Sequence, residues 1–402
     1  MLKVAYISLP RYLSLPILSS IAKEVKKVGV NFYIDTNEEE PNGVAVPDNF
    51  DMTLRINKEL VTTAYNSLKS RNVLKTIKSV KILKKHVNAR MDFLNPDAIV
   101  ATSDMGGLVT RLCNEWAVKH NRPFFIMQPS FLEVNPQSIK VRITNKLIYL
   151  AFNKVLGVPI GRRQQYANCE RKTNYTLLWS GEFSNQMTRK YLENTFSVGN
   201  PLFDKFANQK VRIDVKKPVA LICTQPYEKL VECGILKPYQ ALEMIMMLTQ
   251  AVQQNPDVHF IIKVHPSEDD NDYIKIFGGR YGSNFSITKT GDLTHLLNTA
   301  DVQVSMASYT SFEAVVAGVP IIILHPEFMK FFNQFEGIGL TAKSTHEFNA
   351  CLNFLLQPYP RQLFSENRRK YLNKKLSYFG NSAETTANTI KKVVEWRKKG
   401  FK

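Results

Sequence analysis

The sequence shows no sign of a membrane span, a disulfide framework or a zinc site. No apolar run reaches the roughly 18–20 residues that a membrane-spanning helix needs. The cysteines are odd in number, scattered, and never spaced as Cys-x-x-Cys; they are Cys113, Cys169, Cys223, Cys233 and Cys351. This pattern is typical of free thiols in a reducing compartment. We therefore expect a cytoplasmic protein whose fold depends on neither disulfides nor zinc.

Signs of disorder and of processing are also missing. Apolar residues make up 44% of the 402 residues, a normal share for packed domains, and no low-complexity segment or internal repeat is present. The apolar stretch in residues 1–7 is too short for a signal peptide and lacks a small-residue cleavage site, so we expect a buried strand there. The length allows two domains of ordinary size.

Acidic residues are the scarce charge, and the formal net charge is +18. Residues 1–215 hold 31 Lys and Arg against 18 Asp and Glu, whereas residues 216–402 hold 22 against 17. Such a basic half can face nucleic acid, an anionic membrane surface or an acidic substrate, or it can simply keep the protein soluble. No helix-turn-helix spacing, aromatic RNA-binding motif or set of zinc ligands is found, so we expect no nucleic-acid partner.

Strand-like and helix-like segments alternate along the first part of the chain. Apolar runs predict strands, apolar residues at helical spacing predict helices, and both 52–90 and 138–166 are expected to be basic helical segments. The predicted strands are 4–9, 30–34, 98–102, 123–128, 177–180 and 195–198, and the predicted helices are 17–28 and 106–120. This alternation predicts a parallel sheet with helical crossovers.

A second alternating series follows a polar, charged segment at 201–218. We predict an α/β protein with a first Rossmann-like domain at 1–200, a linker at 201–218, a second Rossmann-like domain at 219–380 and a final helix within 381–402. That helix carries an apolar stripe that needs a partner surface; the stripe consists of Ala383, Ala387, Ile390, Val393 and Val394, with Trp396 at its edge.

A Ser/Thr-rich turn between a strand and a helix is the strongest chemical motif, in residues 300–320. Free backbone N–H groups and hydroxyls at a helix start can bind a phosphate, so Ser308, Thr310 and Ser311 are candidate phosphate ligands. The helix is expected to start near Ser311, which places Glu313 in its first turn, where it can accept hydrogen bonds from ribose hydroxyls. Plain N-capping of the helix is the alternative.

A His-Pro pair ends the buried strand predicted at 259–265. Ligands of open α/β sheets bind at the carboxyl ends of strands, so His265, followed by Pro266, is expected to point toward a crevice and to donate to a phosphate. Lys263 lies close by in the sequence. A purely structural histidine is the alternative.

These two segments resemble the C-terminal donor half of GT-B glycosyltransferases. The pattern is similar to the UDP-N-acetylglucosamine 2-epimerase-like enzymes and to capsule or cell-wall polysaccharide transferases, including CDP-glycerol transferases and bacterial sialyl- and polysialyltransferases. Three further segments fit: 95–100 as a Pro-Asp-hydrophobic strand, 197–204 as a Gly-Asn-Pro-x-x-Asp domain end, and 223–226 as the loop after the first strand of the second domain. The last places Thr224 and Gln225 beside the nucleotide.

The resemblance implies a GT-B fold, in which two domains face a central cleft and the last helix crosses back to the first domain. It also implies transfer of a sugar from a CMP-, UDP- or CDP-linked donor to an acidic glycan or lipid-linked acceptor, in capsule or other cell-surface polysaccharide synthesis. The basic first half of the chain, in turn, predicts a peripheral position on the inner face of the cell membrane. An epimerase or hydrolase acting on a nucleotide sugar is the alternative, although the paired glutamates of the epimerases are missing here.

The sequence does not identify the catalytic base, because the chain has Gln128-Pro129-Ser130 where many relatives have Gln-His-Gly. Asp104, after a strand end, is one candidate and can equally cap the next helix; Glu133 is the other. Arg11 could meet an anionic acceptor, or be an ordinary surface arginine. No Asp-x-Asp motif places a metal ion, so we expect metal-independent chemistry with no cofactor.

Overall fold

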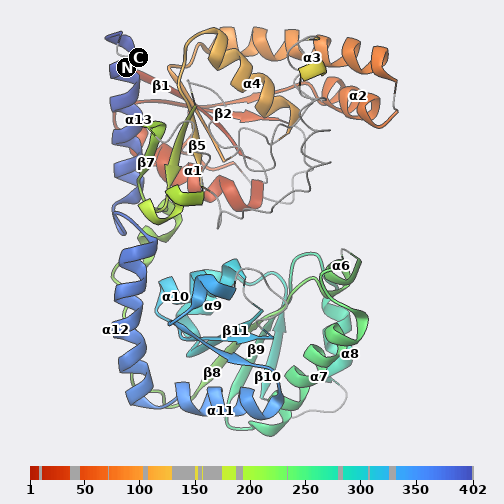
Figure 1. Ribbon diagram of the computed structural model, residues 1–402, viewed down its shortest axis with the longest axis vertical. Coiled ribbons are helices and arrows are strands. Elements are labelled where there is room, and N and C mark those ends of the chain that lie inside the picture. Colours follow the sequence, from red (N-terminus) through yellow and green to blue (C-terminus); the bar gives the residue numbers. More distant parts are fainter. Residues whose placement is uncertain are drawn as a thin grey trace. The chain divides into compact units, whose positions relative to one another are not determined.

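The chain folds into two compact units. The computed structural model describes residues 1–8, 11–36, 46–70, 72–102, 107–128, 150–152, 156, 174–186, 193–232, 234–278, 284–306, 308–325 and 332–400. The first unit contains Met1–Lys205 together with Lys374–Lys402, and the second contains Phe206–Asn373. The segment 201–218, expected to be a linker, is thus divided between the two units, and the C-terminal segment returns to the first (Figure 1).

A seven-stranded parallel sheet forms the centre of the first unit, in the order β3-β2-β1-β4-β5-β6-β7. Its strands are Leu2–Ile7 (β1), Gly29–Asp35 (β2), Met52–Arg55 (β3), Ala98–Ala101 (β4), Phe124–Met127 (β5), Asn174–Leu178 (β6) and Thr195–Ser197 (β7). The sheet reverses its winding between β1 and β4, as in doubly wound folds. The first four residues of the predicted 52–90 helix therefore form a strand; only Leu54 of this strand is buried, so it carries no clear apolar signal.

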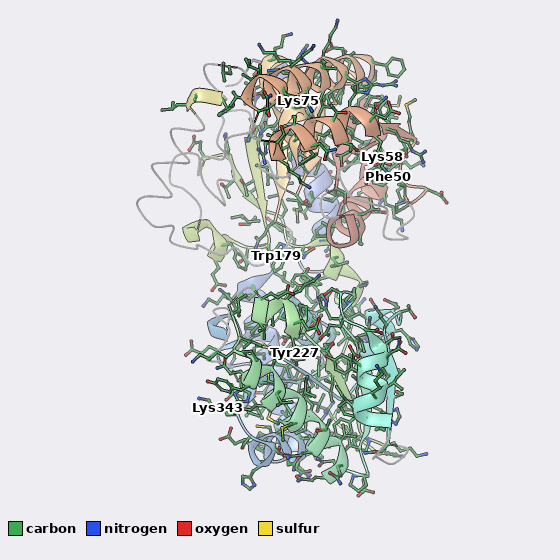
Figure 2. The ribbon with its side chains drawn as sticks, turned by 90° about the vertical axis from the view of Figure 1, so that its right-hand side faces the viewer. Phe50, Lys58, Lys75, Trp179, Tyr227 and Lys343 are labelled. Carbon is green, nitrogen blue, oxygen red and sulfur yellow. The ribbon has the colours of Figure 1, made fainter. Side chains whose placement is uncertain are left out.

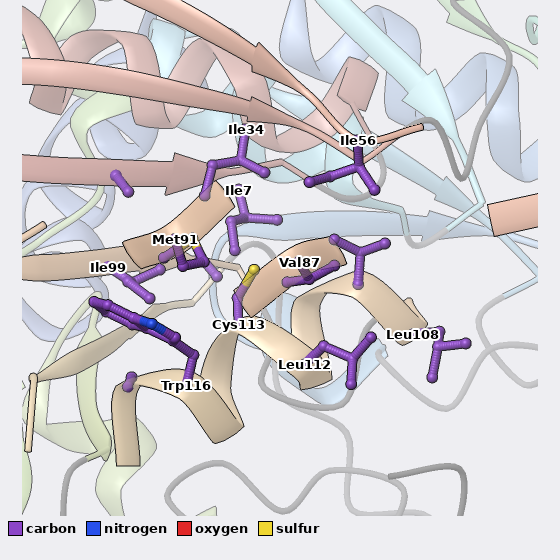
Figure 3. Close-up of a cluster of buried hydrophobic side chains, with 14 of the residues drawn as sticks. Ile7, Ile34, Ile56, Val87, Met91, Ile99, Leu108, Leu112, Cys113 and Trp116 are labelled. Atoms are coloured by element: carbon purple, nitrogen blue, oxygen red, sulfur yellow. The ribbon is translucent and has the colours of Figure 1, made fainter. Parts of the chain in front are cut away.

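Helices cover both faces of this sheet (Figure 1). Helices Lys58–Lys69 (α2), Val73–Leu94 (α3) and Leu108–Lys119 (α4) pack on one face, where Trp116, Met91 and Cys113 meet the strand residues Ile7 and Ile99 (Figure 3). Helix Arg11–Val25 (α1) lies on the other side with Ser382–Lys398 (α13) against it. The predicted helical segment 138–166 falls mostly outside the described residues.

The last helix belongs to the first unit, as predicted. Of its apolar stripe, Ala387, Ile390, Val393 and Val394 are buried, whereas Trp396 is exposed. Near its C-terminal end, Arg397 donates to Asn121 Oδ1 (2.8 Å) and Lys398 forms an ion pair with Asp97 (2.9 Å). The chain enters this helix from Pro358–Lys375 (α12), most of which lies in the second unit.

The Gly-Asn-Pro-x-x-Asp segment fastens the start of this helix to the first unit. Asp204 accepts the backbone N–H groups of Gly380 (3.0 Å), Ser382 (3.1 Å) and Ala383 (2.9 Å). Gly199 has φ +82°, and a Cβ there would lie 2.1 Å from the Ser377 carbonyl oxygen, so no larger residue fits. The Ser377 N–H in turn donates to the carbonyl of Trp179, a residue labelled in Figure 2, at 2.7 Å.

The second unit is built on a six-stranded parallel sheet in the order β10-β9-β8-β11-β12-β13. Its strands are Val219–Cys223 (β8), His259–Lys263 (β9), Phe285–Thr288 (β10), Val302–Ser305 (β11), Ile321–Leu324 (β12) and Gly339–Ala342 (β13). The winding reverses between β8 and β11, as it does between β1 and β4 of the first sheet.

Two groups of helices flank this second sheet. Pro238–Gln254 (α7), Asp270–Gly278 (α8) and Thr345–Leu355 (α11) bury their apolar side chains against Ile222, Ile262, Val302 and Val304. Because side chains alternate along a strand, Cys223, Lys263, Gln303 and Ser305 face the opposite side. Helices Leu293–Thr299 (α9) and Tyr309–Ala317 (α10) lie on that side of the sheet. The short helix Tyr227–Glu232 (α6) is the next element after β8 in the chain.

The predicted α/β class with two Rossmann-like sheets is therefore confirmed. Among the described helices, none combines the length and the apolar character that crossing a membrane requires.

Replacing Asp204 by alanine should loosen the start of α13, because three backbone N–H groups lose a charged acceptor. Hydrogen bonds to charged groups contribute about 1.5–3 kcal/mol, so we expect the free energy of unfolding to fall by about 2 kcal/mol. Urea denaturation measures the change. Glu395→Ala, an exposed carboxylate on the same helix, is the control, and equal stability of the two variants would contradict this role for Asp204.

Candidate functional site

The polar residues identified from the sequence gather at the carboxyl edge of the second sheet. Thr224 follows β8, His265 lies two residues beyond β9, and Ser308 follows β11 by three residues. β8 lies between β9 and β11, and the winding of the sheet reverses between β8 and β11. The carboxyl side of such a reversal is where open α/β sheets bind ligands.

A carboxylate that the sequence analysis missed links the ends of β8 and β9. The Thr224 hydroxyl donates to Glu268 Oε2 at 2.5 Å and accepts the His265 backbone N–H at 2.8 Å. The Glu268 N–H donates to the His265 carbonyl at 2.9 Å, so the loop closes on itself. Thr224 is buried and therefore fixes the loop that carries His265.

Glu268 accepts two further hydrogen bonds through its other carboxylate oxygen, Oε1. Oε1 accepts the Tyr273 hydroxyl at 2.9 Å and the Tyr227 backbone N–H at 3.4 Å. Burial raises the pKa of Glu268 above its usual value, against the lowering effect of these hydrogen bonds. The only signal in the sequence was the acidic residue shortly after His-Pro, in a segment that looks like an ordinary polar loop.

The His265 ring has a defined tautomer. Its Nδ1 accepts the Ser267 backbone N–H at 3.2 Å and lies 2.8 Å from the Ser267 hydroxyl. An Nδ1 that accepts cannot carry the proton of a neutral ring, so this hydrogen-bond assignment places the proton on Nε2. Burial and the positive charges of Lys229 and Lys263 lower the pKa of His265 below 6.5. At neutral pH the ring is an uncharged donor through Nε2.

The Ser/Thr turn starts helix α10 two residues earlier than expected. Ser308 is the N-cap residue with extended backbone, and its side chain makes no capping hydrogen bond to the helix. The Ser308 and Thr310 hydroxyls lie 2.6 Å apart, both half-buried. Because the helix begins at Tyr309, Glu313 lies in the second turn, which corrects the expected position in the first.

Ser311 stabilises the turn from inside the fold. It is fully buried, and its hydroxyl lies 2.7 Å from that of Ser305, which donates to the Met306 carbonyl at 2.6 Å. The hydroxyls of Ser308 and Thr310 thus lie at the more open part of this turn, whereas the hydroxyl of Ser311 is buried and hydrogen-bonded to that of Ser305.

Cys223 lies at the centre of the arrangement. It pairs with Lys263 across β8 and β9, and burial raises the pKa of its thiol to about 11. Gln303, Thr310 and the charge of Lys263 lower that pKa, whereas the charge of Glu313 raises it. The predicted residues Thr310, Lys263 and Glu313 therefore lie around one buried thiol. The Lys263 amine itself donates to the Lys289 carbonyl, and burial lowers its pKa.

The remaining predicted residues divide into two groups. Gln225 is half-buried beside Thr224, with its amide on the Thr224 carbonyl at 3.2 Å, and Pro266 is exposed. Asp104 and Glu133 lie outside the described residues, and Arg11 begins helix α1 with a side chain that is not described. The catalytic base and the acceptor contact therefore stay predictions.

One Asp-x-Asp triplet does occur, which the sequence analysis missed: Asp270-Asn271-Asp272 lies in the first turn of α8. Across the described part of the chain, no group of three or more His, Cys, Asp or Glu side chains could hold a metal ion. Metal-independent chemistry stays a prediction.

Several solved structures share this architecture over nearly their whole length. No protein family model and no curated protein sequence matches the chain. The glycotransferase of kitacinnamycin superposes with a TM-score of 0.59 at 13% identity, over 98% of this chain and 100% of that one. Os79 from O. sativa, solved in complex with UDP, gives 0.59 at 12%, over 97% and 100%. A UDP-N-acetylglucosamine 2-epimerase gives 0.55 at 14%, over 100% and 97%.

The chain has the GT-B fold. At these identities the likeness extends to the fold and not to the reaction. In this GT-B fold the second unit holds the Thr224, His265 and Glu268 network, and the first unit holds the returning α13 helix.

Replacing Glu268 by alanine should weaken both the fold and the site. Thr224 and Tyr273 would lose a charged acceptor, which costs about 1–3 kcal/mol for buried donors. Urea denaturation should show that loss, and Glu232→Ala, an exposed carboxylate on α6, should not. A Glu268→Ala protein as stable as the wild type would show that the network contributes nothing.

The lowered pKa of His265 should be visible in the pH dependence of stability. The unfolded chain binds a proton near pH 6.5 and the folded chain only at lower pH, so this histidine makes the protein less stable as the pH falls through that window. His265→Gln should remove that part of the loss between about pH 7.5 and about pH 5.5. An NMR titration giving a His265 pKa at or above 6.5 would contradict the assignment.

Proposed function

We propose that the protein is a glycosyltransferase that takes a sugar from a nucleotide-activated donor bound at the carboxyl edge of the second sheet. The observation that carries the proposal is that an uncharged Nε2–H donor on His265 and the N-terminus of α10, whose N-cap residue Ser308 makes no side-chain capping hydrogen bond, both lie at the carboxyl edge of the sheet where its winding reverses. The ends of β9 and β11 are two strand spacings apart, about 10 Å, which suits a phosphate group with its ribose.

The chemistry of the site would act on the leaving group. When the sugar departs, negative charge grows on the nucleotide phosphate, and fixed dipoles aimed at that charge stabilise it. The first N–H groups of α10, the Ser308 and Thr310 hydroxyls and His265 Nε2 would supply those dipoles. Glu313 would accept hydrogen bonds from the ribose. The acceptor, an acidic glycan or a lipid-linked sugar of cell-surface polysaccharide synthesis, would be bound by the first unit.

Nucleotide-sugar epimerisation or hydrolysis is the second candidate, because a UDP-N-acetylglucosamine 2-epimerase has the same fold at similar TM-score. The two functions differ in their need for an acceptor. An epimerase or hydrolase changes the donor sugar or releases the nucleotide without an acceptor, whereas a transferase needs one.

Nucleotide binding should depend on His265 and Ser308. Titration calorimetry with CMP, CDP, UDP and GDP identifies the cognate nucleotide. His265→Ala and Ser308→Ala should then each weaken it by about 1–3 kcal/mol, the size of a hydrogen bond to a charged group.

His259→Ala is the matched control, because His259 begins the same strand at the opposite edge of the sheet. Wild-type affinity in both site variants, with unchanged melting temperatures, would rule out this phosphate site. Release of free nucleotide from a nucleotide sugar at equal rates with and without acceptor would favour the second candidate.

A further inference from the structure

The outer face of helix α3 carries a row of unpaired lysines. Lys78, Lys81 and Lys85 are exposed and, among the described residues, form no ion pair, unlike Lys84, which binds Glu115 at 2.7 Å. Their spacing of three and four residues places them on one side of the helix. Residues 58–94 as a whole contain nine Lys and Arg against two Asp and Glu, a net charge of +7; Lys58 and Lys75 of this segment are labelled in Figure 2.

Large apolar side chains stand among these lysines. Leu74 is 81% exposed and Phe93 72% exposed, near the two ends of the 22-residue helix, and Ile82 between them is 48% exposed. Within the described part of the chain, Leu74 and Phe93 stay largely in water, although the inner face of the same helix is fully packed with Val80, Leu83 and Val87. The outer face is thus both basic and apolar.

A groove of about 300 Å³ runs between α2 and α3 on this surface. It is lined by Leu60, Thr63, Lys75, Lys78, Ser79 and Ile82. Its walls are mainly hydrocarbon, and the two lysines supply the only formal charges among its lining residues. Such a groove can accept an apolar chain beside an anionic group.

We propose that α2 and α3 form a docking surface for an anionic lipid membrane. Lysines near an anionic leaflet gain favourable energy from its surface potential, and exposed apolar side chains gain by entering the interface. Nucleic acid or a soluble acidic glycan would complement the lysines alone and would leave Leu74 and Phe93 in water. The combination of positive charge and exposed apolar side chains therefore favours a lipid membrane over nucleic acid or a soluble acidic glycan as the partner. The inference goes beyond the proposed function and is measured without any enzymatic assay.

Vesicle binding tests the lysines. The full chain should bind vesicles of phosphatidylglycerol mixed with phosphatidylcholine at low salt, and should release them as salt screens the attraction. Lys78→Gln, Lys81→Gln and Lys85→Gln combined should weaken that binding about 100-fold, since each cation contributes about fivefold. Lys391→Gln, Lys392→Gln and Lys399→Gln remove the same charge from exposed positions on and just after α13 and should leave binding near the wild-type level.

A second variant tests the apolar side chains. Leu74→Ser with Phe93→Ser should weaken vesicle binding at least about tenfold, because each side chain loses the free energy of leaving water. Leu242→Ser with Ile274→Ser, exposed positions in the second unit, should not. Unchanged melting temperatures would show that the variants are folded.

Three results would overturn the proposal. One is equal recovery of the wild type with neutral and anionic vesicles at low salt. Another is anionic vesicle binding that the α3 lysine variant leaves intact. The third is binding to dextran sulfate that matches vesicle binding and is unaffected by Leu74→Ser with Phe93→Ser, which would identify a polyanion surface instead of a membrane surface.

Discussion

One carboxylate, that of Glu268, determines how the ends of β8 and β9 meet. It accepts the Thr224 hydroxyl and the Tyr273 hydroxyl, and Thr224 in turn accepts the His265 N–H. Hydrogen bonds to a charged acceptor are stronger than neutral ones, and a partner left unpaired inside a protein is costly. The position of the His265 backbone, and through it the direction of the ring, therefore follows from the placement of a side chain three residues away.

The opposite edge of the same sheet is held by charges around the buried Asp301, namely the buried Arg361 and the exposed Arg212. Asp301 accepts Arg212 at 2.7 Å and the Val219 N–H at 2.9 Å, while Arg361 donates to the Asp301 and Leu355 carbonyls. Buried ion pairs add little net stability but are costly to break. This cluster joins the beginnings of β8 and β11, the two strands between which the winding reverses. The strands that carry the candidate site are thus fixed by hydrogen bonds at their beginnings as well as at their carboxyl ends.

Local sequence patterns predicted the secondary-structure elements, but not the contacts between residues far apart in the chain. Apolar periodicity located most strands and helices, because burial of one face is encoded within a few residues. It missed the strand Met52–Arg55, which buries only one side chain, and it placed the start of α10 too late within a run of residues that can all cap a helix. Glu268 was not identified because its donors Thr224 and Tyr227 lie 44 and 41 residues away. No local rule contains such a contact.

The charges of the two halves of the chain differ in a way that fits separate tasks. The candidate donor site relies on an uncharged imidazole, hydroxyls and backbone N–H groups, and the amine of Lys263 is already bound to a carbonyl. A site of this kind needs no strong positive field, and residues 216–402 have only a small excess of cations. The surplus lies in the first half, where Lys78, Lys81 and Lys85 of α3 are exposed and form no ion pair with the described residues, unlike Lys84. Self-repulsion among like charges on one helix is unfavourable, so a surface of this composition gains stability once an anionic partner covers it.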